Sequence, residues 1–163
     1  MSPLSRREFL QSSSAALALA VLGLTGKADG ATVKKYPSIR IGDIRDLKYG
    51  EPLQFNYPDS SSPCNLVMLN GKAISGIGPG SNVVAFSALC PHMGCPLNFS
   101  NDRFVCGCHY SMFDAAKNGQ TYQGLSSQWL AQISLRLDDA GGNIYAEGIS
   151  GLVYGRIGNL NIS

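Results

Sequence analysis

The sequence predicts an all-β fold, an antiparallel sandwich or barrel, and three observations indicate it. The chain of 163 residues contains 19 glycines and few segments with helical periodicity. It contains many short runs rich in β-branched and aromatic residues. Clusters of Gly, Pro, Asn and Asp separate these runs, and many short strands at close spacing are typical of sandwiches and barrels. A chain of this length is sufficient for one domain with a hydrophobic core. The sequence shows no internal repeat and no second domain.

The strongest strand signal is the run Ile133-Ser134-Leu135-Arg136-Leu137, in which apolar and polar residues alternate as in a half-buried strand. Turn residues such as Asn70-Gly71 and Gly78-Pro79-Gly80 separate the other runs. The predicted strands are Ser38–Ile41, Leu53–Tyr57, Leu66–Leu69, Val83–Leu89, Phe104–Val105, Gln132–Leu137 and Asn143–Ala146.

Residues 1–30 resemble a twin-arginine export signal. The motif S-R-R-E-F-L at residues 5–10 precedes an apolar stretch, whose unbroken part, residues 15–24, is about half of the ~20 residues that a membrane-spanning helix needs. Small residues at 28–30 predict cleavage there, which leaves residues 31–163 as one mature domain. We therefore expect a periplasmic protein in an oxidising compartment, tethered to the membrane only if the signal is not cleaved.

Composition excludes several classes of protein. Apolar residues make up 44% of the chain and charged residues 15%, so it is neither a disordered tail nor a multi-span membrane protein. The net charge of +2 is too small to indicate nucleic acid as a partner.

Cysteine and histidine concentrate in two short segments. The chain has two histidines, and four of its five cysteines lie within a few residues of them. The first segment reads C-P-H-M-G-C-P from Cys90, and the second reads C-G-C-H-Y-S-M-F-D from Cys106. Both lie between predicted strands, so we expect two loops, within about residues 88–114, that project from a rigid β base.

Two thiolates and two imidazoles can bind a 2Fe–2S cluster, with both cysteines on one iron and both histidines on the other. Cys90, His92, Cys106 and His109 supply this donor set. Such a cluster is neutral when oxidised and carries −1 when reduced, whereas an all-cysteine cluster passes from −2 to −3. Adding an electron to the neutral site costs less, so histidine ligands raise the reduction potential.

Two other metal centres use similar residues. A zinc site with two cysteines and two histidines needs the same ligand types, but it leaves the additional Cys95 and Cys108 without a role. A c-type haem requires C-x-x-C-H, and the segment from Cys106 to His109 is one residue too short. The remaining cysteine, Cys64, is predicted to be a buried thiol rather than a bridge between subunits.

The two segments resemble the cluster-binding boxes of the Rieske family. The resemblance implies that the cluster ligands are Cys90, His92, Cys106 and His109. In the high-potential branch of the family the two additional cysteines form a disulfide between the loops, which here implies a bond between Cys95 and Cys108.

The same resemblance assigns two positions next to the cluster. Ser111 matches a serine that donates a hydrogen bond to a bridging sulfide. Two residues later, cytochrome bc-type Rieske proteins usually have a tyrosine that donates to a ligand sulfur, whereas this chain has Phe113. We therefore predict a reduction potential below that of quinol-oxidising Rieske proteins.

The whole pattern is similar to the small subunit of arsenite oxidase. The resemblance rests on the export signal, I-G-D-I-R-D-L-K-Y-G-E-P at 41–52, Y-P-D at 57–59, both boxes, and G-L-V-Y-G-R-I-G-N-L at 151–160. It implies a large molybdopterin subunit with a 3Fe–4S cluster, where arsenite is oxidised, and a cytochrome c or blue-copper acceptor. The chain would then be a non-catalytic electron-transfer subunit.

The alternative is the Rieske subunit of a quinol-oxidising cytochrome bc complex. That subunit needs a firm membrane anchor and, in its usual form, a Gly-Pro-rich third loop that shields the cluster. The comparable segment here, residues 123–129, contains no proline, and the apolar stretch near the N-terminus is short.

Overall fold

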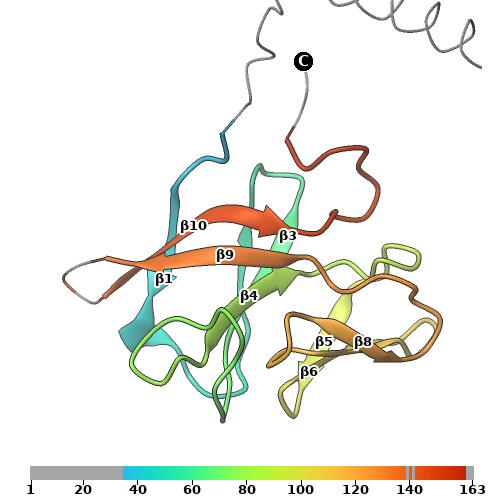
Figure 1. The fold of residues 1–163 in the computed structure, drawn as a ribbon, viewed down its shortest axis with the longest axis horizontal. Coiled ribbons are helices and arrows are strands. Elements are labelled where there is room, and N and C mark those ends of the chain that lie inside the picture. Colours follow the sequence, from blue (N-terminus) through green and yellow to red (C-terminus); the bar gives the residue numbers. More distant parts are fainter. Residues whose placement is uncertain (1–34, 139, 141, 161–163) are drawn as a thin grey trace, which may run out of the picture. The chain divides into compact units, whose positions relative to one another are not determined.

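The computed structural model describes residues 35–138, 140 and 142–160, so the predicted export signal at residues 1–30 lies outside the described part. The predicted all-β class is confirmed (Figure 1). The described residues form ten strands and one short 3-10 helix, Ile44–Asp46. The strands are β1 (Ile39–Asp43), β2 (Leu53–Asn56), β3 (Pro63–Met68), β4 (Val83–Ser87), β5 (Leu97–Ser100), β6 (Arg103–Cys106), β7 (Met112–Asp114), β8 (Gln120–Gln123), β9 (Gln132–Leu137) and β10 (Asn143–Ser150).

The larger sheet contains six antiparallel strands in the order β1-β10-β9-β4-β3-β2. The predicted strand Gln132–Leu137 is confirmed in full as β9. All five residues of β4 are buried, because both faces of the sheet are covered at this strand. This explains why V-V-A-F at residues 83–86 reads as a continuous apolar run rather than an alternating one.

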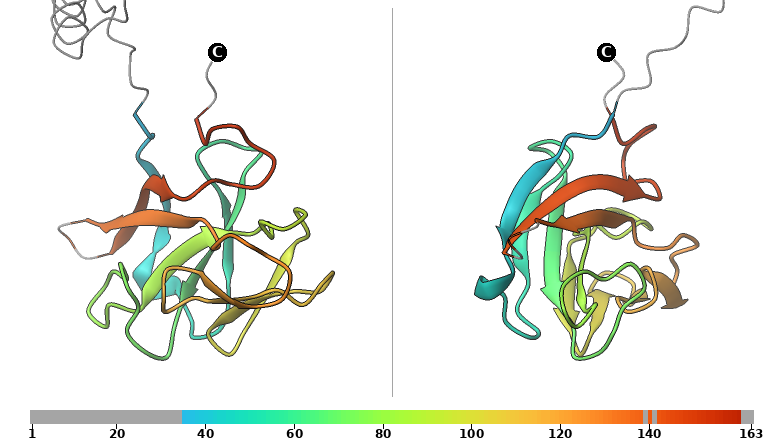
Figure 2. Two further views of the ribbon diagram at one scale, coloured as in Figure 1. Left: turned by 45° about the vertical axis from the view of Figure 1, so that its right-hand side comes forward. Right: turned by 60° about the vertical axis from the view of Figure 1, so that its left-hand side comes forward.

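The smaller sheet contains four antiparallel strands in the order β5-β6-β7-β8. The sequence pattern predicts only the centre of β6, Phe104–Val105, as a strand and indicates loops or turns for the rest of this region. The two cysteine–histidine loops therefore extend from a sheet of their own. Figure 2 shows this sheet, yellow to orange, at one side of the larger sheet.

Two hydrophobic cores lie on opposite faces of β3 and β4. Leu66 and Val83 belong to a core formed within the larger sheet. Val67 and Phe86 face the other way and pack with side chains of the smaller sheet, including Phe104. The rings of Phe86 and Phe104 lie 5.5 Å apart in an edge-to-face arrangement. The smaller sheet is therefore held on the larger one by shared apolar packing.

Within the described residues, no helix has both the length and the apolar character needed to cross a membrane.

Candidate metal centre

The first loop, residues 90–95, connects β4 to β5 and closes on itself. The Cys90 N–H donates to the carbonyl of Cys95, and the Gly94 N–H donates to the carbonyl of Cys90, each at 2.8 Å. Gly94 has φ +71°, a conformation that glycine adopts without a Cβ penalty. A bridge between Leu89 and Pro96 fixes the base of this loop.

The second loop, residues 106–111, connects β6 to β7 and repeats this backbone pattern. The Cys106 N–H donates to the carbonyl of Ser111, and the Tyr110 N–H donates to the carbonyl of Cys106, each at 2.9 Å. Tyr110 has φ +54°, so the fourth residue after the cysteine is left-handed in both loops. The two boxes therefore form matching loops, each with a cysteine at its base.

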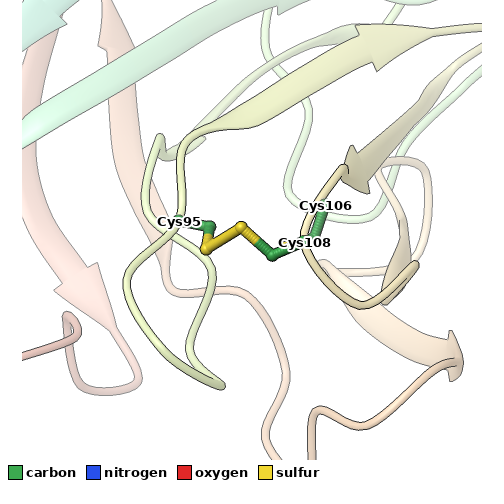
Figure 3. Close-up of side chains that lie close together, drawn as sticks. All are labelled: Cys95, Cys106 and Cys108. Carbon is green, nitrogen blue, oxygen red and sulfur yellow. A yellow bond between two sulfur atoms is a disulfide. The ribbon is translucent and has the colours of Figure 1, made fainter.

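A disulfide between Cys95 and Cys108 joins the two loops (Figure 3). Their Cα atoms lie 6.6 Å apart. The sulfur of Cys106 lies within 4.8 Å of both disulfide sulfurs. Because bonded sulfurs cannot act as thiolates, Cys106 is the member of this trio that remains available as a metal ligand.

Two free thiols meet beneath the loops. Cys90 and Cys106 are unpaired and buried, with exposed fractions of 0% and 1%. Burial and a hydrogen bond with the Cys106 thiol raise the pKa of the Cys90 thiol. Without a metal ion Cys90 therefore favours the protonated thiol, and a bound cation would supply the charge that stabilises the thiolate.

The two imidazoles lie edge to face at the outer end of the loops. The ring centroids of His92 and His109 are 4.9 Å apart, with the ring planes at 80°. His92 is half-buried and His109 is exposed. Among the described residues, the buried Nδ1 of His92 has no hydrogen-bond partner. An orphaned buried nitrogen is costly, and coordination to a metal ion would satisfy it.

These residues fit a 2Fe–2S cluster. Two thiols and two imidazoles converge from matching loops, and the buried Nδ1 of His92 has no hydrogen-bond partner among the described residues. The structure thus brings together all four residues that the sequence analysis proposed as ligands. The assignment of each one to an iron stays a prediction.

Ser111 links the second loop to the segment that follows β8. Its side chain is fully buried, and its Oγ accepts the N–H groups of Leu125 and Ser126, each at 3.1 Å. Gly124 has φ +90°, and a Cβ atom there would overlap the backbone of Ser111. Although it contains no proline, the segment 123–129 therefore packs directly against the second loop. Sequence reasoning missed this contact, and its only signal was the glycine at position 124.

Phe113 lies in β7 opposite Phe104 and is fully buried. It belongs to the same hydrophobic core as Cys90 and Cys106. The structure therefore places its ring in the apolar surroundings of the proposed ligands.

Cys64 lies apart from this site. It is 1% exposed in β3, and its thiol lies 3.6 Å from the carbonyl oxygen of Tyr57 and 3.5 Å from that of Ser62. Burial raises its pKa to about 12. The prediction of a buried thiol is confirmed for this structure.

Comparison with known proteins identifies relatives of this chain. Residues 38–131 match the model of the "Rieske [2Fe-2S] domain". The chain is 38% identical over 162 residues to the iodate reductase subunit IdrB of Denitromonas iodatirespirans, covering 96% of this chain and 86% of that protein. It is also 38% identical to the subunit of the same name from Pseudomonas sp. (strain SCT), covering 93% and 82%.

Other similarities are more distant. The cytochrome bc1 complex Rieske iron-sulfur subunit of Corynebacterium diphtheriae is 35% identical over 60 residues, which is 35% of this chain and 15% of that protein. Among solved structures, the soluble domain of Rieske protein II (soxF) from Sulfolobus acidocaldarius matches with a TM-score of 0.66 and 21% identity. That match covers 76% of this chain and 83% of the other, and it shows the shared fold.

The family match decides between the cluster and zinc in favour of the 2Fe–2S cofactor. It agrees with the disulfide and with the free, buried thiols in the loops. Two relatives that align along nearly the whole chain are named as iodate reductase subunits, so the finer assignment to arsenite oxidase is not established. This chain belongs to the Rieske [2Fe-2S] family.

Proposed function

We propose that this chain is the electron-transfer subunit of a periplasmic oxidoreductase that acts on a small oxyanion. The observation that carries the proposal is the convergence of two buried free thiols and two facing imidazoles, one with an orphaned nitrogen, at loops joined by a disulfide. Such a site suits single-electron exchange, and we assign no catalytic residue to this chain.

In this proposal Cys90 and Cys106 bind one iron, and His92 and His109 bind the other. When bound, the cluster supplies one-electron redox chemistry at a potential that the histidine ligands raise. The burial of both cysteines excludes water from the sulfur side. The histidines form the outer edge of the site, since His109 is exposed and His92 half-buried, so a partner can approach from that edge.

The proposed partners are a large molybdopterin subunit with a 3Fe–4S cluster and a cytochrome c or blue-copper protein. The resemblance of the sequence pattern to arsenite oxidase small subunits suggests a subunit of this kind, and the alignment of iodate reductase subunits along most of the chain supports it. Arsenite, expected from the first, and iodate, from the names of the second, are the two candidate substrates of the large subunit. Export by the twin-arginine route would place the assembly in the periplasm.

The cytochrome bc alternative has weaker support. The match to a bc1 Rieske subunit covers about a third of this chain, whereas the IdrB subunits match almost all of it. Co-purification with cytochrome b rather than with a molybdenum protein would favour this alternative.

Ligand substitution tests the site. Cys90→Ser and His92→Ala should each abolish the electron paramagnetic resonance (EPR) signal of the dithionite-reduced protein. Cys64→Ala is the matched control, because it removes a buried free cysteine outside the site and should keep the signal. Full signals in both ligand variants would refute the assignment, and wild-type protein without iron and acid-labile sulfide would refute the proposed function.

The native complex tests the partner and the substrate. We expect this chain to purify with a large subunit that contains molybdenum. Arsenite-dependent reduction of cytochrome c and iodate-dependent oxidation of a reduced donor should then be measured on the same preparation. Activity with neither oxyanion, or purification without a molybdenum protein, would contradict the proposal.

A further inference from the structure

The glycine-rich segment near the C-terminus, residues 151–160, reaches the first cluster-binding loop. A Cβ atom added to Gly94 would overlap ring carbons Cε1 and Cδ1 of Tyr154 and would lie 3.2 Å from Cζ. The tyrosine ring therefore rests directly on the Gly94 backbone. In the left view of Figure 2 the red C-terminal segment lies next to the yellow-green loop that contains residue 94.

Gly94 holds the backbone of that loop between the proposed ligand Cys90 and the disulfide. Its N–H donates to the carbonyl of Cys90, and it immediately precedes Cys95 of the disulfide. A ring packed on Gly94 opposes movement of this residue toward the ring, and so opposes opening of the loop between Cys90 and Cys95 on that side. The second loop is held in a comparable way, by Gly124 packed on Ser111.

The segment that carries Tyr154 is itself fixed. Arg156 makes an ion pair of 2.8 Å with Asp59, and its Nη2 also donates to Ser61 Oγ at 2.9 Å. Its guanidinium is largely buried, with 14% of the side chain exposed, so this pair is screened less than a surface pair. The segment is thereby attached to the turn between β2 and β3.

A second set of contacts closes the segment on itself. Asn159 accepts the Val153 N–H at 2.9 Å through Oδ1 and donates to the Gly151 carbonyl at 2.7 Å through Nδ2. Val153, next to Tyr154, is 2% exposed. The backbone on both sides of the ring is therefore held, although the ring itself is 40% exposed.

We propose that residues 151–160 act as a brace for the first cluster-binding loop, with Tyr154 as the positioning residue. The inference rests on the proposed ligand roles of Cys90 and His92. The brace limits opening of the loop and keeps water from its backbone, and it thereby slows loss of the cluster. Tyr154 is not one of the proposed ligands, and we infer that it acts on the cluster indirectly, through the backbone of Gly94.

The test compares the rate of cluster loss among variants of the purified complex. Visible absorption is followed at fixed temperature in the presence of an iron chelator. Tyr154→Ala should lose its cluster roughly tenfold faster, because the packing of an aromatic ring no longer opposes loop opening. Tyr154→Phe keeps the ring and should behave as wild type. Tyr49→Ala removes a tyrosine that is 62% exposed elsewhere and should also behave as wild type.

Two further measurements separate positioning from a general effect on folding. Arg156→Gln keeps the ring but releases the segment from Asp59, so it should also accelerate cluster loss. Melting of the β sheets is followed by circular dichroism, and a positioning role predicts accelerated loss well below the melting transition. Equal rates in Tyr154→Ala and wild type, or acceleration only in proportion to a lowered melting temperature, would overturn the inference while the proposed function stands. Wild-type protein that contains no cluster would overturn both.

Discussion

Ser111 provides the sharpest test of how the protein tunes its cluster. Its Oγ accepts two backbone N–H groups, from Leu125 and Ser126, and the side chain is fully buried. With two donors directed at the oxygen, the serine's own hydroxyl hydrogen is left to point elsewhere, and we predict from the family resemblance that it donates to a bridging sulfide. Ser111→Ala therefore removes two kinds of interaction at once.

The loss of the hydrogen bond to the cluster changes the reduction potential, and the loss of the acceptor for two N–H groups changes the free energy of unfolding. A hydroxyl donor stabilises the reduced cluster, which carries one more negative charge, over the oxidised one. The loss of one such hydrogen bond, about 0.5–1.5 kcal/mol, lowers a one-electron potential by about 20–60 mV. The two N–H groups left without an acceptor should lower the free energy of unfolding by about 1–3 kcal/mol, since they lie in a closely packed region.

Voltammetry and denaturant unfolding of Ser111→Ala measure the two effects separately. Ser126→Ala is the matched control: it removes a neighbouring buried hydroxyl, whose Oγ donates to Gln128, and leaves Ser111 unchanged. We expect this control to keep the wild-type potential. If Ser111→Ala retains its EPR signal and its potential is unchanged or higher, the serine only holds the segment 123–129 and the reasoning about the cluster is wrong.

Three other predictions concern Phe113, the disulfide and Cys64. Phe113→Tyr should raise the potential by about 20–60 mV if the new hydroxyl donates to a ligand sulfur, and an unchanged or lower value in voltammetry would contradict this. The disulfide closes a chain separation of 13 residues, so replacing Cys95 and Cys108 by serine should cost about 3 kcal/mol in denaturant unfolding; an unaltered midpoint would show that the loops are held by other contacts. Because the pKa of Cys64 is raised to about 12, its thiol stays protonated below that pH. Iodoacetamide at pH 8 should therefore label Cys64 only after unfolding, as mass spectrometry would show.

The sequence predicted the larger sheet better than the smaller one for a physical reason. The β4 and β9 regions contain several apolar residues whose burial gives a clear pattern, and Gln132–Leu137 was predicted with its observed bounds. The smaller sheet is built differently. β8, Gln120–Gln123, contains no buried residue, and β7 has three residues, so neither has the period of a strand. Their pairing depends on neighbouring strands and on the core behind Phe113.

The site also has a part that the sequence predicted, the proposed ligands, and a part that it did not, the contacts that hold the loops. Residue types and spacing were sufficient to locate the two loops, because metal-binding side chains are rare and were grouped in the chain, and the family resemblance then named Cys90, His92, Cys106 and His109 as the expected ligands. The contacts that hold the loops were not predictable. Gly94 and Tyr154 are separated by 60 positions, and neither residue type predicts that the tyrosine ring packs on that glycine. Such contacts arise from the path of the chain rather than from a local pattern.

Three segments that form or adjoin the site contain no charged residue, and this affects how a partner binds. Residues 88–97, 104–112 and 118–131 contain no Asp, Glu, Lys or Arg. The exposed side chains there include Met93, Tyr110 and Leu125, with exposed fractions of 58%, 66% and 63%. A partner that binds at the histidine edge therefore meets apolar and uncharged polar groups, and Coulombic steering to this surface is weak.

From this we predict a weak ionic-strength dependence of electron transfer at this surface. Charged docking surfaces lose association rate steeply as salt rises, because the Debye length falls from about 30 Å at ~0.01 M to about 8 Å at ~0.15 M. Stopped-flow reduction of the acceptor by the reduced complex should change less than about threefold over that range. Met93→Lys is the informative variant, since a charge beside the site should introduce salt dependence with an acidic acceptor. A steep decline in the wild-type rate with rising ionic strength would mean that electrons leave through a charged surface elsewhere on the complex. The proposal that the partner binds at the histidine edge would then be wrong.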